Sequence, residues 1–163
     1  MVCLFSKEEF QVDELCTYLI EHNIQIASTE SFTVGTFASR IGMHPGISKV
    51  YRGSVVSYQT MIKHKVLGID QTLIDHYGVV SSEIAHDMAT HGKALFDSDV
   101  CISFTGNAGP DAMEGKKVGQ IYIGIAAYDD VYTFAYELSG SRQEIVDQAI
   151  SLGCVNLLKV LKK

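Results

Sequence analysis

The sequence has few cysteines, no long apolar run and no recognisable leader segment. No stretch is apolar enough to cross a bilayer, and the N-terminal residues lack the basic segment, apolar run and cleavage site of a secretory signal. The cysteines are scattered without a C-x-x-C pair, which favours small core side chains over disulfides or a metal site. They are Cys3, Cys16, Cys101 and Cys154. We therefore expect a reduced, cytoplasmic protein that does not enter membranes.

Basic residues are in the minority, with 13 Lys and Arg against 19 Asp and Glu and a formal net charge of −6. This balance argues against broad binding to nucleic acids or anionic membranes, although backbone N–H groups can still hold an anionic ligand locally. Of the 163 residues, 47% are hydrophobic and 20% are charged, which is typical of a globular protein. The chain is expected to form one domain over residues 1–163.

Several catalytic motifs are also missing. The sequence has neither G-x-x-x-x-G-K-[ST] nor G-x-G-x-x-G, which argues against a nucleoside triphosphatase loop or a dinucleotide fingerprint. The G-x-S-x-G elbow of α/β-hydrolases is absent too. The six histidines form no H-E-x-x-H spacing, and His86 and His91 are out of phase on the predicted helix that holds them. No metal or other cofactor is therefore expected.

The hydrophobic pattern alternates between predicted strands and helices. The predicted strands cover residues 24–29, 50–58, 100–105, 120–127 and 131–138, the last two as a hairpin. The predicted helices cover residues 33–41, 61–67, 73–77, 81–95 and 142–162, after a first helix that ends near residue 22 and begins at a capping box formed by Ser6 and Glu9. This order predicts an α/β fold, a three-layer α/β/α sandwich with a mixed, mostly parallel sheet and one antiparallel strand.

Three predicted strands end in unusual polar segments. Because ligands of open α/β sheets bind outside the carboxyl ends of the strands, we expect these segments to converge on one cleft. The segments are Thr29-Glu30-Ser31-Phe32-Thr33, Tyr58-Gln59-Thr60-Met61-Ile62-Lys63 and Thr105-Gly106-Asn107-Ala108-Gly109-Pro110.

The first segment places Ser31 between a strand and a helix. A serine there can act as a nucleophile beside the free N–H groups of a helix N-terminus, which stabilise an oxyanion. It can equally be the N-cap of that helix, and caps are far commoner. Glu30 is expected either to support the site through hydrogen bonds or to cap the next helix.

The second segment places Tyr58 at the end of a strand and Lys63 about one turn into the next helix. A lysine partly removed from water has a depressed pKa and can replace histidine as the base for a serine nucleophile. Tyr58 can relay a proton or orient the pair. The alternative is a solvated surface lysine.

The third segment has two glycines, Gly106 and Gly109, that let the backbone approach a ligand closely, and Thr105 offers a hydroxyl. It is either a phosphate cradle or an ordinary Gly-Pro turn. Arg142, at the start of the last helix, is expected to pair with a phosphate or with an acidic neighbour.

Taken in order, the segments resemble the C-terminal domain of the competence/damage-inducible protein CinA, the nicotinamide-nucleotide amidase (PncC) family. The resemblance covers nearly the whole chain. Its pieces are Thr29 to Gly35, Pro45-Gly46, Tyr51 to Tyr58, Lys63 with Leu67-Gly68, Tyr77 to Ser81, Thr105 to Pro110, Val118-Gly119 and Gly140-Ser141-Arg142.

The resemblance implies a mixed-sheet α/β/α domain that hydrolyses the carboxamide of nicotinamide mononucleotide to nicotinic acid mononucleotide and ammonia, without a metal. It implies Ser31 as nucleophile, Lys63 as general base and Tyr58 as proton relay. The N–H groups near Thr33 and Gly35 are expected to stabilise the oxyanion. Thr105, Gly106 and Gly109 are expected to face the nucleotide, and either the glycine backbone or Arg142 to bind its phosphate. The family likeness also implies a homo-oligomer.

The chain departs from the family pattern at several positions. It has Phe32-Thr33-Val34-Gly35 where the family often has Cys-Thr-Gly-Gly, and Gln59-Thr60-Met61 where the family often has Ser-Asn-Glu. Asn107 stands where an apolar residue is usual, and Ser141 where an Asp is usual. Retention of Ser31, Tyr58 and Lys63 favours an amidase. The alternative is a nucleotide-binding or partner-binding module that keeps the pocket without efficient turnover.

Overall fold

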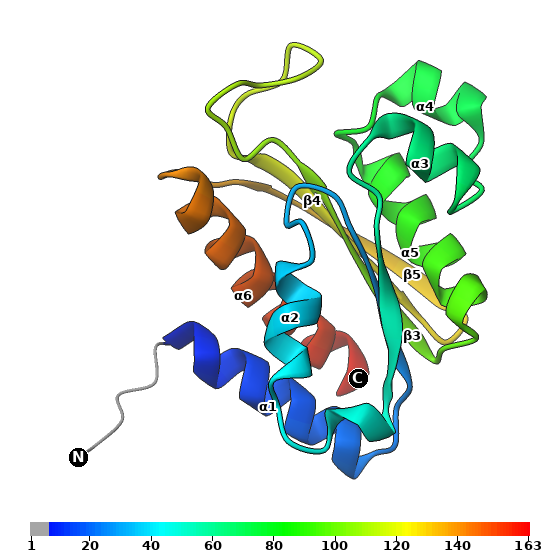
Figure 1. Cartoon of the computed structure of the whole chain (residues 1–163), viewed down its shortest axis with the longest axis vertical. Helices are drawn as coiled ribbons and strands as arrows, with labels where there is room; N and C mark the ends of the chain where they lie inside the picture. The colour runs from blue at the N-terminus through cyan, green and yellow to red at the C-terminus, as the bar shows by residue number, and fades with distance from the viewer. Residues whose placement is uncertain (1–6) are drawn as a thin grey trace.

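The computed structural model describes the backbone of residues 7–163 and the side chains from residue 11 onward. At its centre is a five-stranded sheet in the order β2-β1-β3-β4-β5 (Figure 1). The strands are β1 (Ile26–Glu30), β2 (Tyr51–Val56), β3 (Val100–Gly106), β4 (Gln120–Ala127) and β5 (Asp130–Glu137). β1 is parallel to β2 and β3, and β4 is antiparallel to both of its neighbours. The predicted mixed sheet with one antiparallel strand is confirmed.

Helices cover both faces of the sheet (Figure 1). One layer holds α1 (Lys7–Glu21), α2 (Thr36–Gly42) and α6 (Arg142–Leu161), and the other holds α3 (Thr60–Lys65), α4 (Gln71–Tyr77) and α5 (Ser82–Phe96). Each layer buries its own apolar cluster, the larger around Ile102 and Phe104 and the smaller around Ile84 and Met88. Burial of these side chains is the main force that holds the three layers together.

The helix after β1 begins at Thr36, three residues later than the sequence predicts, and this difference matters for the site. Val34 and Gly35 have φ of 49° and 82°, which lie outside the right-handed helical region. Residues 31–35 therefore form a turn. The N-cap of α2 is Gly35, which has no side chain to accept a capping hydrogen bond. The N-cap interpretation of Ser31 is wrong.

Other boundaries also shift. β2 ends at Val56, two residues before the predicted end of the strand, so Tyr58 lies in the connection to α3. A short 3-10 helix, Ile47–Lys49, precedes β2 and was not predicted. Cys16, Cys101 and Cys154 are buried and free, as expected of core side chains, and burial raises the pKa of Cys16 and of Cys154 to about 12. Cys3 and the predicted capping box at Ser6 lie outside the described residues.

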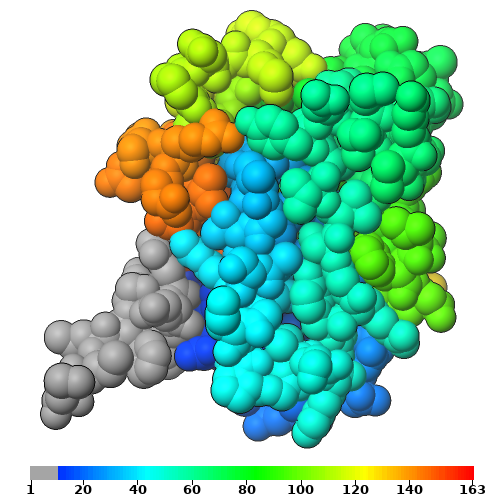
Figure 2. Space-filling model, in the orientation of Figure 1, coloured from blue at the N-terminus to red at the C-terminus, as the bar shows by residue number. Residues whose placement is uncertain are grey.

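The register of the parallel strands brings the three polar segments together. Glu30, the last residue of β1, lies opposite Val56 on β2 and Phe104 on β3. The chain continues the ladder for one more step, since Ser31 N donates to Phe104 O (3.0 Å) and Ser57 N donates to Glu30 O (2.8 Å). Figure 2 shows the outcome at the surface, where the residues after β2, the loop after β3 and the start of α6 gather at one end of the molecule.

Candidate functional site

Ser31 and Lys63 meet beneath this surface. The Lys63 Nζ atom lies 2.9 Å from Ser31 Oγ and donates a second hydrogen bond to Ser57 O at 2.6 Å. Lys63 is only 1% exposed and Ser31 is 9% exposed. The surface-lysine interpretation is therefore wrong, and two residues that are 32 positions apart in sequence form a buried pair.

Burial gives Lys63 unusual acid–base properties. Removal of the amine from water lowers the pKa of Lys63 from 10.5 to about 8, and the negative charge of Glu114 opposes this shift. About a tenth of the amine is therefore neutral at pH 7, far more than for an amine of ordinary pKa. With one N–H held by Ser57 O, the neutral amine can turn its lone pair to the Ser31 hydroxyl and accept its proton.

Glu30 holds the turn that presents Ser31. Its buried carboxylate accepts from the N–H groups of Phe37 (3.2 Å) and Ala38 (2.9 Å), and from the Thr33 hydroxyl (2.7 Å). These donors belong to the turn and to the first residues of α2, where a negative charge is favoured. The bonds to Phe37 and Ala38 fulfil the predicted capping role, and the bond to Thr33 fixes the turn that carries Ser31.

The turn also leaves backbone donors free. Among the described residues, the N–H groups of Phe32, Thr33 and Gly35 have no hydrogen-bond acceptor, while Val34 N donates to Ser31 O (3.2 Å). Free backbone donors next to a nucleophile are the usual components of an oxyanion hole. The expected donors at Thr33 and Gly35 are thus unpaired, although neither residue lines the cavity beside Ser31, and Phe32, which does line it, is a further donor.

A cavity of about 140 Å³ opens beside Ser31. It gathers five of the predicted site residues, namely Ser31, Tyr58, Gly106, Gly109 and Arg142, together with Phe32, Asn107, Ala108, Asp111 and Met113. At its mouth, an Arg142 guanidinium nitrogen donates to Gly109 O (2.7 Å) and another lies 3.5 Å from the Tyr58 hydroxyl. No acidic side chain among the described residues pairs with Arg142.

Thr105 is not among the residues that line this cavity. Its hydroxyl is buried and donates to Val79 O at 2.6 Å, so it ties β3 to the residues that precede α5. The two glycines of the segment are needed for close packing. A Cβ atom at Gly106 would lie 2.6 Å from the Ile121 side chain, and one at Gly109 would lie 2.8 Å from the Val118 side chain.

Besides the Phe32 N–H group, sequence reasoning missed four contributors. The Ser57 carbonyl orients the Lys63 amine. Asp111 and Met113 line the cavity, and the charge of Glu114 raises the pKa of Lys63. Ser57 directly precedes Tyr58, so its position at a strand end was a usable signal. The other three lie in a loop whose path no local pattern specifies.

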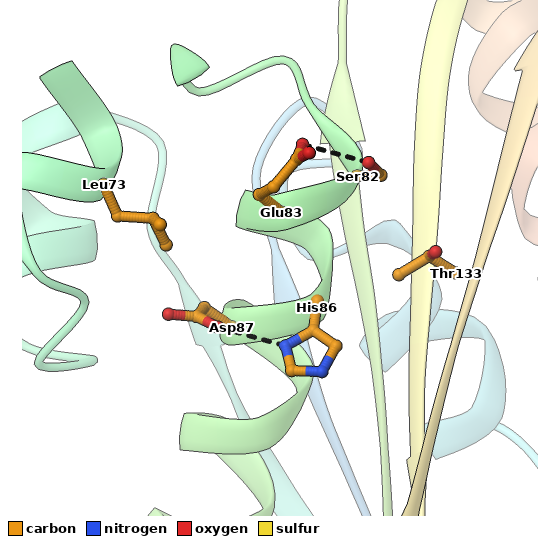
Figure 3. A pocket seen from close by; sticks show the side chains of 6 residues that line it. All are labelled: Leu73, Ser82, Glu83, His86, Asp87 and Thr133. Carbon is orange, nitrogen blue, oxygen red and sulfur yellow. Dashed lines mark hydrogen bonds and ion pairs between the residues drawn. The ribbon is translucent and has the colours of Figure 1, made fainter. Parts of the chain in front are cut away.

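A second hollow, with a volume of about 270 Å³, lies between α4, α5 and β5. Figure 3 shows the six side chains that line it. Here His86 Nδ1 lies 3.1 Å from Asp87 Oδ1 on the surface of α5. Among the side chains of residues 11–163, no cluster of three or more His, Cys, Asp or Glu is arranged to hold a metal ion. The same part of the chain has no helix long and apolar enough to span a membrane.

The fold and the site together define a three-layer α/β protein with a buried serine–lysine pair and a cavity at the carboxyl ends of its parallel strands. The model of the CinA C-terminal domain family matches residues 8–161, and the chain therefore belongs to this family.

Two curated relatives carry the name competence-damage inducible protein. The one from Bacillus subtilis is 40% identical over 152 residues, which cover 93% of this chain and 36% of the relative. The one from Listeria innocua is 40% identical over 155 residues, which cover 91% of this chain and 37% of the relative. The chain thus spans little more than a third of the length of these relatives.

Solved structures agree with the fold. A CinA superfamily protein from Escherichia coli superposes with a TM-score of 0.91 at 26% identity, covering 98% of this chain and 94% of the other. The competence/damage inducible protein CihA from Agrobacterium tumefaciens gives a TM-score of 0.91 over the whole of both chains, at 22% identity, and supports the fold alone.

Proposed function

We propose that the chain is an amidohydrolase that converts nicotinamide mononucleotide to nicotinic acid mononucleotide and ammonia by a Ser–Lys mechanism. The observation that carries this proposal is the 2.9 Å contact between Lys63 Nζ and Ser31 Oγ in a nearly water-free setting. A lysine with a pKa near 8 is matched to the removal of a proton from a hydroxyl at neutral to mildly alkaline pH.

In the first half-reaction, neutral Lys63 takes the hydroxyl proton as Ser31 Oγ attacks the carboxamide carbon. The negative charge that develops on the carboxamide oxygen is stabilised by the free N–H groups of Phe32, Thr33 and Gly35. The C–N bond breaks as the nitrogen receives a proton from the Lys63 ammonium, and ammonia leaves. Ser31 is then esterified by the pyridine carboxyl group.

In the second half-reaction, water attacks the ester carbon while Lys63 accepts one of its protons. The tetrahedral intermediate collapses, Ser31 Oγ recovers a proton from Lys63, and the carboxylate product is released. Atoms and charges balance over the cycle, since one amide and one water give one carboxylic acid and one ammonia. Neither an oxidant nor a further reactant is needed.

The cavity suits one end of such a substrate. Its volume of about 140 Å³ is below the range of roughly 300–1,000 Å³ for sites that enclose a whole small ligand, so we assign it the pyridine carboxamide. Arg142 and Tyr58 at the mouth then face the ribose phosphate. We assign the phosphate to Arg142, because its guanidinium has donors beyond the one committed to Gly109 O.

Tyr58 keeps its proposed place in the site, and its proton-relay role stays a prediction. No hydrogen bond joins it to Ser31 or Lys63 among the described residues, and Arg142 is its polar neighbour. The proposal includes a cytoplasmic homo-oligomer with a small pyridine nucleotide as its ligand.

Release of ammonia from nicotinamide mononucleotide tests the proposal. Wild type and Ser39→Ala, which removes an exposed hydroxyl from α2, are expected to release ammonia, and Ser31→Ala is expected to fall to the background rate. Background rates in all three proteins would overturn the amidase. Binding of the nucleotide in that case would favour a binding module without turnover. The structural reason would be Val34, a stiff β-branched residue with φ of 49° in the turn that carries the free N–H groups, where the family often has glycine.

A further inference from the structure

The loop between β3 and β4, residues 107–119, reaches across to the residues that join α4 to α5. The Glu114 carboxylate accepts from the N–H groups of Val79 (2.8 Å) and Val80 (3.2 Å). The preceding residue, Gly78, makes room for it, because a Cβ atom there would lie 2.4 Å from Glu114 Oε2. The carboxylate is therefore seated in a backbone cradle that a larger residue at position 78 would fill.

A second side chain of this loop, Lys116, binds the same segment, residues 77–80. The Lys116 ammonium donates to Val80 O and lies 3.4 Å from Tyr77 O. One loop thus binds both the N–H groups and the carbonyl groups of residues 77–80, with side chains of opposite charge. β3 adds a third contact through the Thr105 hydroxyl on Val79 O.

The same loop, residues 107–119, also forms one wall of the cavity beside Ser31. Ala108, Gly109, Asp111 and Met113 all line the space beside Ser31, and Met113 is the residue before Glu114. Asn107 fixes the far side of this wall, since its side-chain amide donates to Met113 O (3.3 Å) and accepts from Met113 N (3.2 Å). Met113 is therefore held from both sides, by Asn107 directly and by Glu114 through the chain.

From these contacts we infer that Glu114 is a positioning residue, which holds the substrate-facing wall of the cavity in place by binding the N–H groups of Val79 and Val80. The inference rests on the proposed function only for its kinetic consequences. An unfixed wall must be ordered when substrate binds, and that ordering weakens binding without changing the reacting groups.

Glu114 also has an electrostatic effect on the site. The other charged groups near Lys63 are directed elsewhere: Glu30 caps α2, His64 Nδ1 is 2.7 Å from Ile69 O, and Lys65 is exposed. Glu114 is the charge that raises the pKa of Lys63 against burial. Removal of this charge should therefore extend activity to lower pH, an effect that a purely structural role would not produce.

Two variants separate the contacts of Glu114 from its charge. Glu114→Ala loses both, and we expect amide exchange at Val79 and Val80 to quicken at least about tenfold and the KM for nicotinamide mononucleotide to rise about tenfold, with kcat within about threefold of wild type. Glu114→Gln keeps one acceptor oxygen, for Val79 N, and places an –NH2 donor against Val80 N. Exchange at Val79 and the KM should therefore stay within about threefold of wild type, while the acid limb of kcat/KM moves down by about half a pH unit.

Glu21→Ala is the matched control, because it removes an exposed carboxylate from α1, far from the 107–119 loop, and should leave exchange, KM and the pH profile unchanged. Wild-type exchange at Val79 and Val80 in Glu114→Ala would overturn the inference, as would an unchanged KM. An acid limb that stays in place in Glu114→Gln would also contradict the charge effect. The exchange measurement needs no turnover, so it decides the inference even where the amidase proposal fails.

Discussion

Tyr58 and Lys63 both follow β2, five positions apart in sequence, but their side chains lie in opposite environments. Lys63 is 1% exposed and bonded to Ser31 and Ser57 O, whereas Tyr58 is 56% exposed and faces Arg142 at the mouth of the cavity. The difference divides the site into a buried pair, which we propose carries out the reaction, and an exposed rim. Proton transfer needs the first environment, because an amine in water would stay protonated near pH 7, and recognition of a charged ligand suits the second.

Loss of the interior amine should have the largest effect. Lys63→Ala removes the proposed base, so we expect the rate of ammonia release to fall at least about a hundredfold. Lys65→Ala, which removes an exposed amine from the same helix, should stay near the wild-type rate. Single-turnover measurement of ammonia release compares the two, and a near-normal rate in Lys63→Ala would remove Lys63 from the mechanism.

The pH profile probes the same interior group without a mutation. Protonated Lys63 cannot accept the Ser31 proton, and the pKa of Lys63 is about 8. We therefore expect kcat/KM to rise about tenfold per pH unit below this value and to level off above it. A profile measured between about pH 6 and pH 10 checks the limb, and a flat profile across that range would contradict a lysine base.

The rim should respond more weakly. Tyr58→Phe removes one hydroxyl near Arg142, and we expect the KM for nicotinamide mononucleotide to rise about three- to tenfold with little change in kcat. Tyr128→Phe, at the exposed β4–β5 turn on the other end of the sheet, is the control. A hundredfold fall in kcat would instead place Tyr58 in the proton relay and erase the division between interior and rim.

The smallest expected effect is on stability, from a substitution in the turn of residues 31–35 that holds Ser31 at the edge of the cavity. Val34 is 54% exposed and has φ of 49°, a conformation that a β-branched residue adopts at a cost. Val34→Gly should relieve this cost and raise the free energy of unfolding by about 1 kcal/mol. Denaturant titration measures the change. Val66→Gly, at an exposed valine with φ of −99°, should be destabilising.

The sequence predicted that the three polar segments converge, because periodic patterns predict strands and parallel strands end at one edge. The pairing of Ser31 with Lys63 came from the family resemblance, since the residue pattern left a surface lysine as the alternative. Ser31, Tyr58 and Lys63 each follow a strand that the pattern locates to within about two residues. Register then does the rest, since Glu30 lies opposite Val56 and Phe104.

Individual hydrogen bonds were not predictable in the same way. Glu30 bonds both to α2 and to the turn before it, and these bonds depend on two left-handed residues, one of them a valine that local preference disfavours there. Thr105 and Glu114 act on Val79, which is 26 and 35 positions away, so no local pattern relates them. Such contacts follow from tertiary placement rather than from propensity.

Burial of Lys63 has a consequence for folding itself. The unfolded chain binds a proton on this amine up to about pH 10.5 and the folded chain only up to about pH 8. Between these values unfolding takes up a proton, so the free energy of unfolding rises with pH across that window, and at pH 7 it is lower by ~3 kcal/mol than for an amine of ordinary pKa. A domain whose total stability is about 5–15 kcal/mol therefore carries a buried amine that weakens its own fold in the pH range where it is expected to work.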